Sequence, residues 1–255
     1  MKRTRVLHKA ARLWLCSLIA LLGLNFNISN AQTGVYTFGT DNANEGGRVL
    51  CDDPVHQRMY IGGYRRDSTL IMMVDYNGYI LGETTFMVSD VGARDILTDL
   101  KFSANDSFLI GTGIQLPTAG TQYGGYIFRM TRNLVMDWMQ DFPTGTNSLL
   151  PKNIQDLGTN FTYYVVMGAC YPNYDASFLR VDKQTGTTIT NSTHRYDVGG
   201  PEDFEASVIQ GQDLFITGRL GHSGGDMFLR PGLVRMNGTT GTIIPNNQHT
   251  YLVDS

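Results

Sequence analysis

Two side chains in a glycine-rich segment combine groups that suit metal binding or general-base catalysis. His222 supplies an imidazole and Asp226 a carboxylate. Gly224, Gly225 and Pro231 make this segment a loop, so the spacing of His222 and Asp226 does not place them on one helix face. Both are candidate ligand-binding residues, and a solvated surface histidine is the simpler alternative.

Two further groups of candidate ligand-binding residues lie beside apolar stretches. Arg65 and Arg66 are adjacent, and a guanidinium group can hold a carboxylate or phosphate through two parallel hydrogen bonds. Tyr123, Tyr171 and Tyr174 offer flat aromatic faces that bind sugar rings or peptides at little entropic cost. The alternatives are structural: adjacent arginines at a strand end split between its two sides, and tyrosines fill contacts between repeats.

Acidic residues recur where an apolar stretch begins. They are Asp95 and Asp99, then Asp156, then Glu202, Asp203 and Glu205. Calcium takes about six to eight oxygen ligands, so carboxylates that face one another around a channel form a candidate calcium site. Hydrogen bonds to water and to neighbouring backbone amides are the alternative. No EF-hand or nonapeptide calcium repeat is present, so we expect no cofactor, with calcium as the exception to test.

Several familiar catalytic motifs are absent from the sequence. It contains no phosphate-binding loop, no His-Glu-x-x-His zinc motif and no Gly-x-Gly-x-x-Gly turn. Paired carboxylates can cleave glycosidic bonds, but a chain with 23 acidic residues brings such pairs together by chance. These observations favour binding over catalysis.

A repeated pattern indicates the elements that position these side chains. Four short apolar segments each contain a glycine, at positions 62, 111, 168 and 218, spaced by 49, 57 and 50 residues. The segments are Met59–Tyr64, Phe108–Gly113, Tyr164–Ala169 and Leu214–Arg219. A period of roughly 40–50 residues with four strands per unit is typical of β-propeller blades. The sequence therefore predicts an all-β protein, a β-propeller of about four blades in one domain, residues 32–255.

Strand-forming residues alternate with turn residues in every unit, and no stretch has the period of a long helix. The strands expected in units one and two are Arg48–Asp52, Arg58–Tyr64, Thr69–Asp75, Tyr79–Phe86, Leu97–Ser103, Ser107–Gly113, Gly125–Thr131 and Leu134–Phe142. Those expected in units three and four are Ile154–Gly158, Tyr163–Ala169, Ser177–Asp182, Thr187–Tyr196, Glu205–Gln210, Asp213–Arg219, Leu233–Asn237 and Thr242–Tyr251.

The link between the third and fourth strands is the most regular part of the repeat. Asn-Gly and Thr-Gly pairs in it supply the positive φ that tight hairpins require. Asp75, Asp182 and Asn237 stand at the strand end before this turn. Because these residues recur at one structural position, we expect them to bond to the turn backbone rather than to act as catalysts or metal ligands.

The first 31 residues have the features of a secretory signal peptide. Five basic residues precede Leu13–Leu24, a nearly continuous apolar run, and Ser29-Asn30-Ala31 predicts cleavage before Gln32. A membrane span needs about 20 apolar residues, so we expect export rather than anchoring. The mature protein is then secreted, extracellular or at the cell surface, with no membrane span.

The charge of the mature chain excludes one class of partner. Residues 1–31 hold five basic and no acidic residues, which leaves 15 Lys and Arg against 23 Asp and Glu, a formal charge of 15 − 23 = −8. Sequence-independent binding of nucleic acid requires a basic face. We therefore expect no nucleic-acid partner.

Cys51 and Cys170 are the cysteines that remain after residue 31. Their places in the repeat put them well apart, whereas a disulfide needs Cα atoms within about 7 Å. Export would permit a disulfide, but we expect two separate thiols. No cluster of cysteine and histidine suggests a structural zinc site.

The motif Val181-Asp-Lys-Gln-Thr-Gly186, together with the apolar strand that runs into a glycine, resembles the bacterial secreted β-propeller repeat proteins common among Bacteroidota. The resemblance covers about residues 45–251, and Met130-Thr-Arg-Asn133 is its poorest match. It implies an exported propeller, often part of a longer surface-bound chain.

Two departures from that family leave the completeness of the propeller open. Its members commonly have about six to eight blades and often a type IX sorting domain, whereas four units are present here and no such segment follows Tyr251. We expect a small closed propeller in which Gly34–Phe38 completes the last sheet, which removes exposed edges. A truncated propeller, or one completed by an oligomer, is the alternative.

Three functions fit these features. The first is a non-enzymatic propeller that binds a glycan, peptide or protein partner through its loop face. The second is a propeller hydrolase or lyase acting on extracellular polysaccharide, and the third is a structural spacer in a longer surface protein. A propeller fold hosts all three, so the choice depends on the site.

Overall fold

A computed structural model of the chain describes residues 44–88, 94–104, 108–116, 123–142, 150–158, 162–170, 175–189, 194–196, 203–220 and 230–250. The predicted signal peptide and the expected strand Gly34–Phe38 lie outside these ranges. All the strands below belong to one unit of the chain, Phe38–Ser255.

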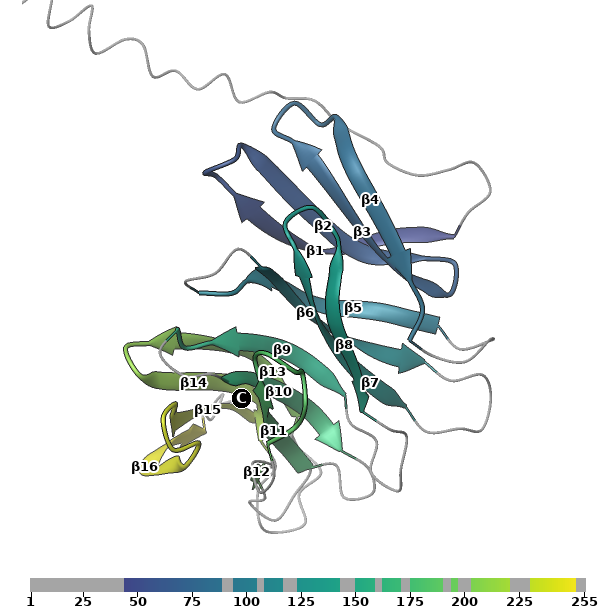
Figure 1. Ribbon diagram of the computed structural model, residues 1–255. Coiled ribbons are helices and arrows are strands. Elements are labelled where there is room, and N and C mark those ends of the chain that lie inside the picture. Colours follow the sequence, from purple (N-terminus) through teal and green to yellow (C-terminus); the bar gives the residue numbers. More distant parts are fainter. Residues whose placement is uncertain are drawn as a thin grey trace, which may run out of the picture. The chain divides into compact units, whose positions relative to one another are not determined.

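In the described ranges, sixteen strands form four antiparallel sheets of four, and each sheet is an up-and-down meander in chain order (Figure 1). Blade one consists of β1 (Glu45–Asp53), β2 (Arg58–Arg65), β3 (Ser68–Asp75) and β4 (Ile80–Phe86). Blade two consists of β5 (Arg94–Phe102), β6 (Phe108–Leu116), β7 (Gly124–Thr131) and β8 (Met136–Phe142).

Blade three consists of β9 (Pro151–Asp156), β10 (Thr162–Cys170), β11 (Asp175–Asp182) and β12 (His194–Tyr196). Blade four consists of β13 (Asp203–Gln210), β14 (Asp213–Leu220), β15 (Arg230–Asn237) and β16 (Ile243–Thr250). Every predicted strand overlaps an observed one. The main difference is the last strand of blade three, predicted as Thr187–Tyr196, of which the structure shows His194–Tyr196 and a single bridge between Val181 and Thr188.

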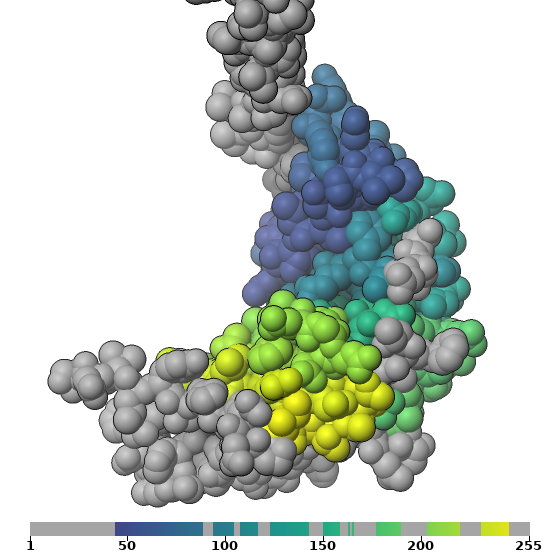
Figure 2. Space-filling view, turned by 90° about the vertical axis from the view of Figure 1, so that its left-hand side faces the viewer, coloured from purple at the N-terminus to yellow at the C-terminus, as the bar shows by residue number. Residues whose placement is uncertain are grey.

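Successive blades pack face to face through side chains with almost no exposed surface, and the colour order of Figure 2 follows their succession. Tyr60 and Ile71 of blade one pack with Leu109 and Phe128 of blade two. Equivalent cores join blades two and three around Ile110, Ile127, Val165 and Leu179, and blades three and four around Phe178, Leu214, Ile216 and Val234. The first strands also contact one another, β1 with β5, β5 with β9 and β9 with β13. These stacked four-stranded sheets confirm the predicted all-β propeller fold.

Each blade carries a β-bulge in its first strand, where one residue has no partner on the second strand. The bulged residues are Arg48, Thr98, Lys152 and Glu205. A bulge changes the direction of one side chain. Every blade therefore has, at the same structural position, one first-strand residue that is not paired in the hydrogen-bond ladder.

The bulges account for the repeated glycines and correct the alignment of the units. The residues paired beside the four bulges are Gly63, Gly113, Met167 and Gly218. Among the glycines used to align the units, Gly218 alone occupies this position. In the other three blades, the position beside the bulge lies one or two residues from the aligned glycine. A Cβ on Gly63 or Gly218 would lie 1.8 or 2.1 Å from a first-strand carbonyl oxygen, so the two strands require glycine here.

The turns between third and fourth strands have the predicted chemistry. The Asp75 carboxylate accepts from the amides of Asn77 and Tyr79 at 2.9 and 2.8 Å, and Asp182 and Asn237 accept in the same way from their own turns. Backbone hydrogen bonds from Thr185 lower the pKa of Asp182. The structural assignment of Asp75, Asp182 and Asn237 is confirmed.

Two turn glycines predict different effects of alanine, Gly186 in the β11–β12 turn and Gly211 in the β13–β14 turn. Gly186 (φ +75°) would bring a Cβ to 2.5 Å from the Trp138 ring of blade two, whereas Gly211 (φ +65°) has open space around it. Gly211→Ala therefore adds only left-handed backbone strain, about 1 kcal/mol, and Gly186→Ala adds a clash on top, about 3 kcal/mol in all. Urea unfolding of both variants measures the difference, and equal losses would show that the Trp138 contact is unimportant.

Cys51 is buried and free, so the expected separate thiols are confirmed for this residue. Burial raises the pKa of the Cys51 thiol to about 11. In the part of the chain that the structure describes, no helix is long and apolar enough to cross a membrane.

Candidate functional site

The first strands begin at the same end of the blades as the loops between strands two and three. Glu45 pairs with Arg65 in blade one, and Asp203 pairs with Arg219 in blade four. We call this the loop end. The bulged residues lie within a few positions of it, so bulge side chains and loop side chains share one end of the fold.

At the loop end of blades three and four, four charged side chains form a connected group that we call the Arg219 cluster: Asp203, Glu205, Arg219 and Lys152. Arg219 donates to the carboxylates of Asp203 and, at 3.5 Å, Glu205. Lys152 donates to Glu205 at 3.2 Å from the neighbouring blade. The Asp203 hydrogen bond raises the pKa of Arg219, which stays charged. The side chains of Arg219 and Glu205 are 53% and 45% exposed, so a ligand can reach them.

A second group, the polar row, crosses the first strands of blades two, three and four. Asn153 lies at its centre: its amide donates to Asp99 at 2.6 Å, and its carbonyl oxygen accepts from Lys101 at 3.3 Å and Gln155 at 2.7 Å. The Ser207 hydroxyl also donates to that oxygen. Buried polar groups need such partners, and here the partners come from different blades. The polar row therefore holds three first strands in register beside the Arg219 cluster.

Arg65, a predicted anion ligand, is occupied by carboxylates of its own blade. It donates to Glu45 of β1 at 2.6 Å and to both oxygens of Glu83 of β4 at 2.8 and 3.0 Å. The hydrogen bond from Arg65 lowers the pKa of Glu83. The two-pronged geometry expected for Arg65 is present, but Glu83 is its partner, so Arg65 braces the sheet from edge to edge.

Arg66 and Tyr123 are accessible, as their loop positions predicted. Arg66 lies in the β2–β3 turn at φ 56°, with its side chain exposed, and its carbonyl oxygen accepts from Arg94 at 3.4 Å. The structural alternative, in which Arg65 lies across the sheet and Arg66 points outward, is therefore observed, and ligand binding by these residues stays a prediction. Tyr123 precedes β7 and is 46% exposed. Tyr171, Tyr174, His222 and Asp226 lie outside the described residues.

The acidic residues of the first strands bind blade neighbours. Asp99 accepts from the Ile154 amide at 2.9 Å, and Asp156 accepts from the Ala104 amide at 2.9 Å, each across a blade junction. Within the described ranges, no three side chains of the His, Cys, Asp or Glu type gather as metal ligands do. Glu202 lies outside those ranges. Contacts to backbone amides, the alternative given above, are thus observed for Asp99 and Asp156, and calcium stays a prediction.

One short motif in the loop after β14 was not anticipated. Gly221-His-Ser-Gly-Gly225 has the Gly-x-Ser-x-Gly spacing of a hydrolase nucleophile elbow. Such an elbow joins a strand to a helix in an α/β sheet, whereas this segment joins the antiparallel strands β14 and β15. The surrounding fold therefore does not supply the context that the motif requires.

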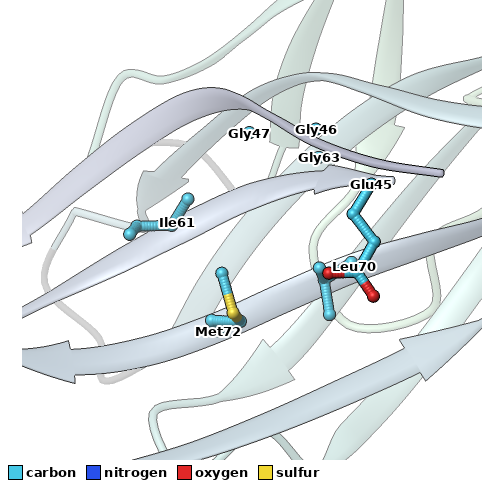
Figure 3. A pocket seen from close by; sticks show the side chains of 7 residues that line it. All are labelled: Glu45, Gly46, Gly47, Ile61, Gly63, Leu70 and Met72. Carbon is cyan, nitrogen blue, oxygen red and sulfur yellow. The ribbon is translucent and has the colours of Figure 1, made fainter. Parts of the chain in front are cut away.

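Blade one has a pocket of about 220 Å³ on the face turned away from blade two. Figure 3 shows Ile61, Leu70 and Met72 below a backbone ridge of three glycines, with the Glu45 side chain at one end. Residues that alternate with these, Tyr60 and Ile71, pack on blade two. The lining is mainly apolar, so this pocket suits an apolar group rather than a sugar.

Sequence reasoning missed Lys152, Asn153 and Arg219 as site residues. Asp99, Asp203 and Glu205 were predicted only as candidate calcium ligands. The bulge is the missing signal, since it determines which first-strand side chains meet between blades, and no single repeat reveals it.

Comparisons with solved structures give only distant likenesses in fold. No protein-family model matches the chain, and no curated protein matches it. The solved structures similar to it include an endo-arabinase from Bacteroides thetaiotaomicron, with 11% identity and a TM-score of 0.48, over 84% of this chain and 81% of that one. A likeness this distant transfers no activity.

Proposed function

We propose that this protein is an exported β-propeller that binds a glycan, without cleaving it, at the loop end of blades three and four. The observation that carries the proposal is the Arg219 cluster. Its exposed donors and acceptors come from two blades, and Lys152 is followed directly in the chain by Asn153, the centre of the polar row. Sugar hydroxyls both donate and accept, so they are matched by paired charges such as Lys152 with Glu205.

The predicted signal peptide supports an extracellular partner, and the charge of −8 opposes a polyanionic one. Tyr123 adds an exposed aromatic ring at the loop end. Tyr171, Tyr174, His222 and Asp226 belong to loops of the same end by their chain position. They stay proposed contacts, as does a calcium ion.

A glycoside hydrolase is the second candidate, because Asp203 and Glu205 both contact one guanidinium nitrogen of Arg219. Two carboxyl groups held close together are the machinery of glycoside cleavage. Both carboxylates, however, are already engaged by cations: Arg219 donates to both of them, and Lys152 also donates to Glu205. Binding without turnover is therefore the better-supported function.

The test measures binding to neutral and acidic polysaccharides by affinity electrophoresis, and release of reducing sugar in the same samples. We expect saturable binding without release, weakened at least tenfold by Glu205→Gln. Asp137→Asn is the matched control, because Asp137 is also partly exposed and also paired with an arginine, and it should bind normally. Repeating the assay with a chelator tests calcium.

Three results would contradict the proposal. Sugar release that Glu205→Gln abolishes would establish the hydrolase. Equal losses in the Glu205 and Asp137 variants would show a non-specific charge effect. No binding to any polysaccharide would favour the structural spacer.

A further inference from the structure

Each inner blade has two distinct packing faces. We call the face that packs on the preceding blade the entry face. In blade two it carries Leu109, Tyr126 and Phe128. Ile110 and Ile127 alternate with them along the strands and pack on the following blade, on the onward face. The same two faces recur through the stack, so the strand registers identify the equivalent residues in the end blades.

Blade one presents an entry face without a described preceding blade. The pairs Met59 with Val74, Ile61 with Met72 and Gly63 with Leu70 stand where blade two has Leu109 with Met130, Gly111 with Phe128 and Gly113 with Tyr126. The pocket of Figure 3 lies on this face, over Ile61, Leu70 and Met72. On β3 of this face, Leu70, Met72 and Val74 are only 3%, 5% and 1% exposed, so the open part of the face is its first-strand edge, where Leu50 is 62% exposed.

Blade four presents the matching onward face. Phe215 pairs with Arg235 and Thr217 with Leu233, as Ile110 pairs with Arg129 and Thr112 with Ile127 in blade two. Phe215 and Leu233 are only partly buried, whereas Ile110 and Ile127 have no exposed surface. The last blade thus keeps the apolar side chains by which an inner blade holds its successor.

A recurring contact between first strands predicts which residues meet at such a junction. The third residue after the bulge of one blade contacts the second residue after the bulge of the next. Lys101 donates to the Ile154 carbonyl at 3.0 Å, and Gln155 donates to the Ser207 carbonyl at 2.7 Å.

At the first junction, Cys51 and Leu100 share one apolar core. Continuing the series from blade four to blade one pairs Val208 with Leu50. These two apolar side chains are 61% and 62% exposed, whereas Leu100, at the same place in an occupied junction, is 2% exposed.

We propose that the onward face of blade four binds the entry face of blade one of a second copy, with Val208 against Leu50. The occupant is a second copy because each chain carries both halves of this junction, Leu50 on β1 and Val208 on β13, and leaves both exposed. The contact is head-to-tail, and such contacts close into rings when the rotation per copy allows. This inference goes beyond glycan binding, and it concerns different residues.

Light scattering coupled to size exclusion tests the assembly on the full chain. We expect a mass of at least two copies for the unchanged protein and one copy for Leu50→Asp and for Val208→Asp. Both positions are exposed in the single chain, so the variants should fold. Val55→Asp is the control, since Val55 is 82% exposed in the β1–β2 turn and outside the proposed contact, and it should keep the larger mass. A one-copy mass for the unchanged protein would overturn the proposal.

Cysteine cross-linking identifies the contact itself. A mixture of Leu50→Cys and Val208→Cys proteins, treated with a short bis-maleimide, should give a product of two chains, and a mixture of Val55→Cys and Val208→Cys should not. Cys51 is buried with a raised pKa, so its thiol reacts poorly. Cys170 is replaced by serine in every variant, so that it does not contribute a second reactive thiol.

The double variant Leu50→Cys, Val208→Cys separates the two ways of joining the faces. An internal cross-link within one chain would show that the propeller closes on itself and would overturn the second-copy assignment. Absence of both products would overturn the junction. Glycan binding is also measured with Leu50→Asp, the variant expected to stay a single copy. Because that measurement does not require assembly, it tests the proposed function independently of the second-copy contact.

Discussion

Replacing Gly63 with alanine is expected to lower the free energy of unfolding by about 3 kcal/mol or more. The added methyl group would lie 1.8 Å from the Gly46 carbonyl oxygen and close to the Gly47 backbone. Both obstacles belong to the backbone of the neighbouring strand, so no side-chain rotation relieves the clash. Either β1 separates from β2 at the bulge or the variant fails to fold. Chemical denaturation, with circular dichroism as the readout, measures the loss.

Gly82→Ala is the matched control for that experiment. Gly82 is also a strand glycine of blade one, but the nearest atoms to its added Cβ are side-chain carbons of Met73 and Leu134 at 3.5 and 3.9 Å. Ordinary van der Waals contact predicts a change within about 1 kcal/mol. If Gly63→Ala is as stable as Gly82→Ala, the bulge does not require glycine and the explanation of the repeat is wrong.

Asp53→Asn is expected to cost about 3 kcal/mol, because it removes the charge that holds two arginines and a histidine. The Asp53 carboxylate is 1% exposed and accepts from Arg132 at 2.7 Å, Arg58 at 3.1 Å and His56 at 3.0 Å. Arg132 comes from blade two, where its carbonyl oxygen also accepts from Tyr60 at 2.8 Å. The loss of Asp53 therefore loosens the junction between blades one and two.

Asp75→Asn controls for the change of carboxylate to amide. Asp75 accepts two turn amides, and Asn237 does the same in blade four. An amide oxygen therefore suffices there, and the variant should lose less than about 1 kcal/mol. Equal losses for the two variants would show that the Asp53 charge contributes nothing specific.

Asp53 also predicts a pH dependence. Burial by itself would raise the pKa of Asp53, but hydrogen bonds from His56, Arg132 and Arg58 outweigh burial and lower the pKa from 3.8 to about 2. A lowered folded-state pKa gives stability that is fully present above the unfolded value and is lost as pH falls through the folded one. About 2 kcal/mol should therefore disappear between pH 4 and pH 2. Asp53→Asn should lack that part of the decline, and an unchanged acid profile would contradict the assignment.

Local sequence patterns were enough to predict the blade architecture. Period-two apolar strands and regular turns are local features, so they placed strands close to all sixteen observed ones. Asp75, Asp182 and Asn237 were interpreted correctly for the same reason, since each bonds to amides two to four residues further on. The separation of Arg65 from Arg66 likewise followed from strand geometry.

Tertiary structure decided which side chains meet between blades. The partner of Arg65 is Glu83, and that of Lys152 is Glu205, 53 residues further along the chain. A bulge shifts the strand register by one residue, and one residue exchanges the two faces of a strand. In three blades the glycine used to align the units lies one or two residues from the position beside the bulge. An error of that size does not change the number or order of the strands, so the blades were predictable from local pattern. It does change which side chains meet, so the Arg219 cluster and the exposed Leu50 and Val208 side chains depended on a register that only the packed sheets define.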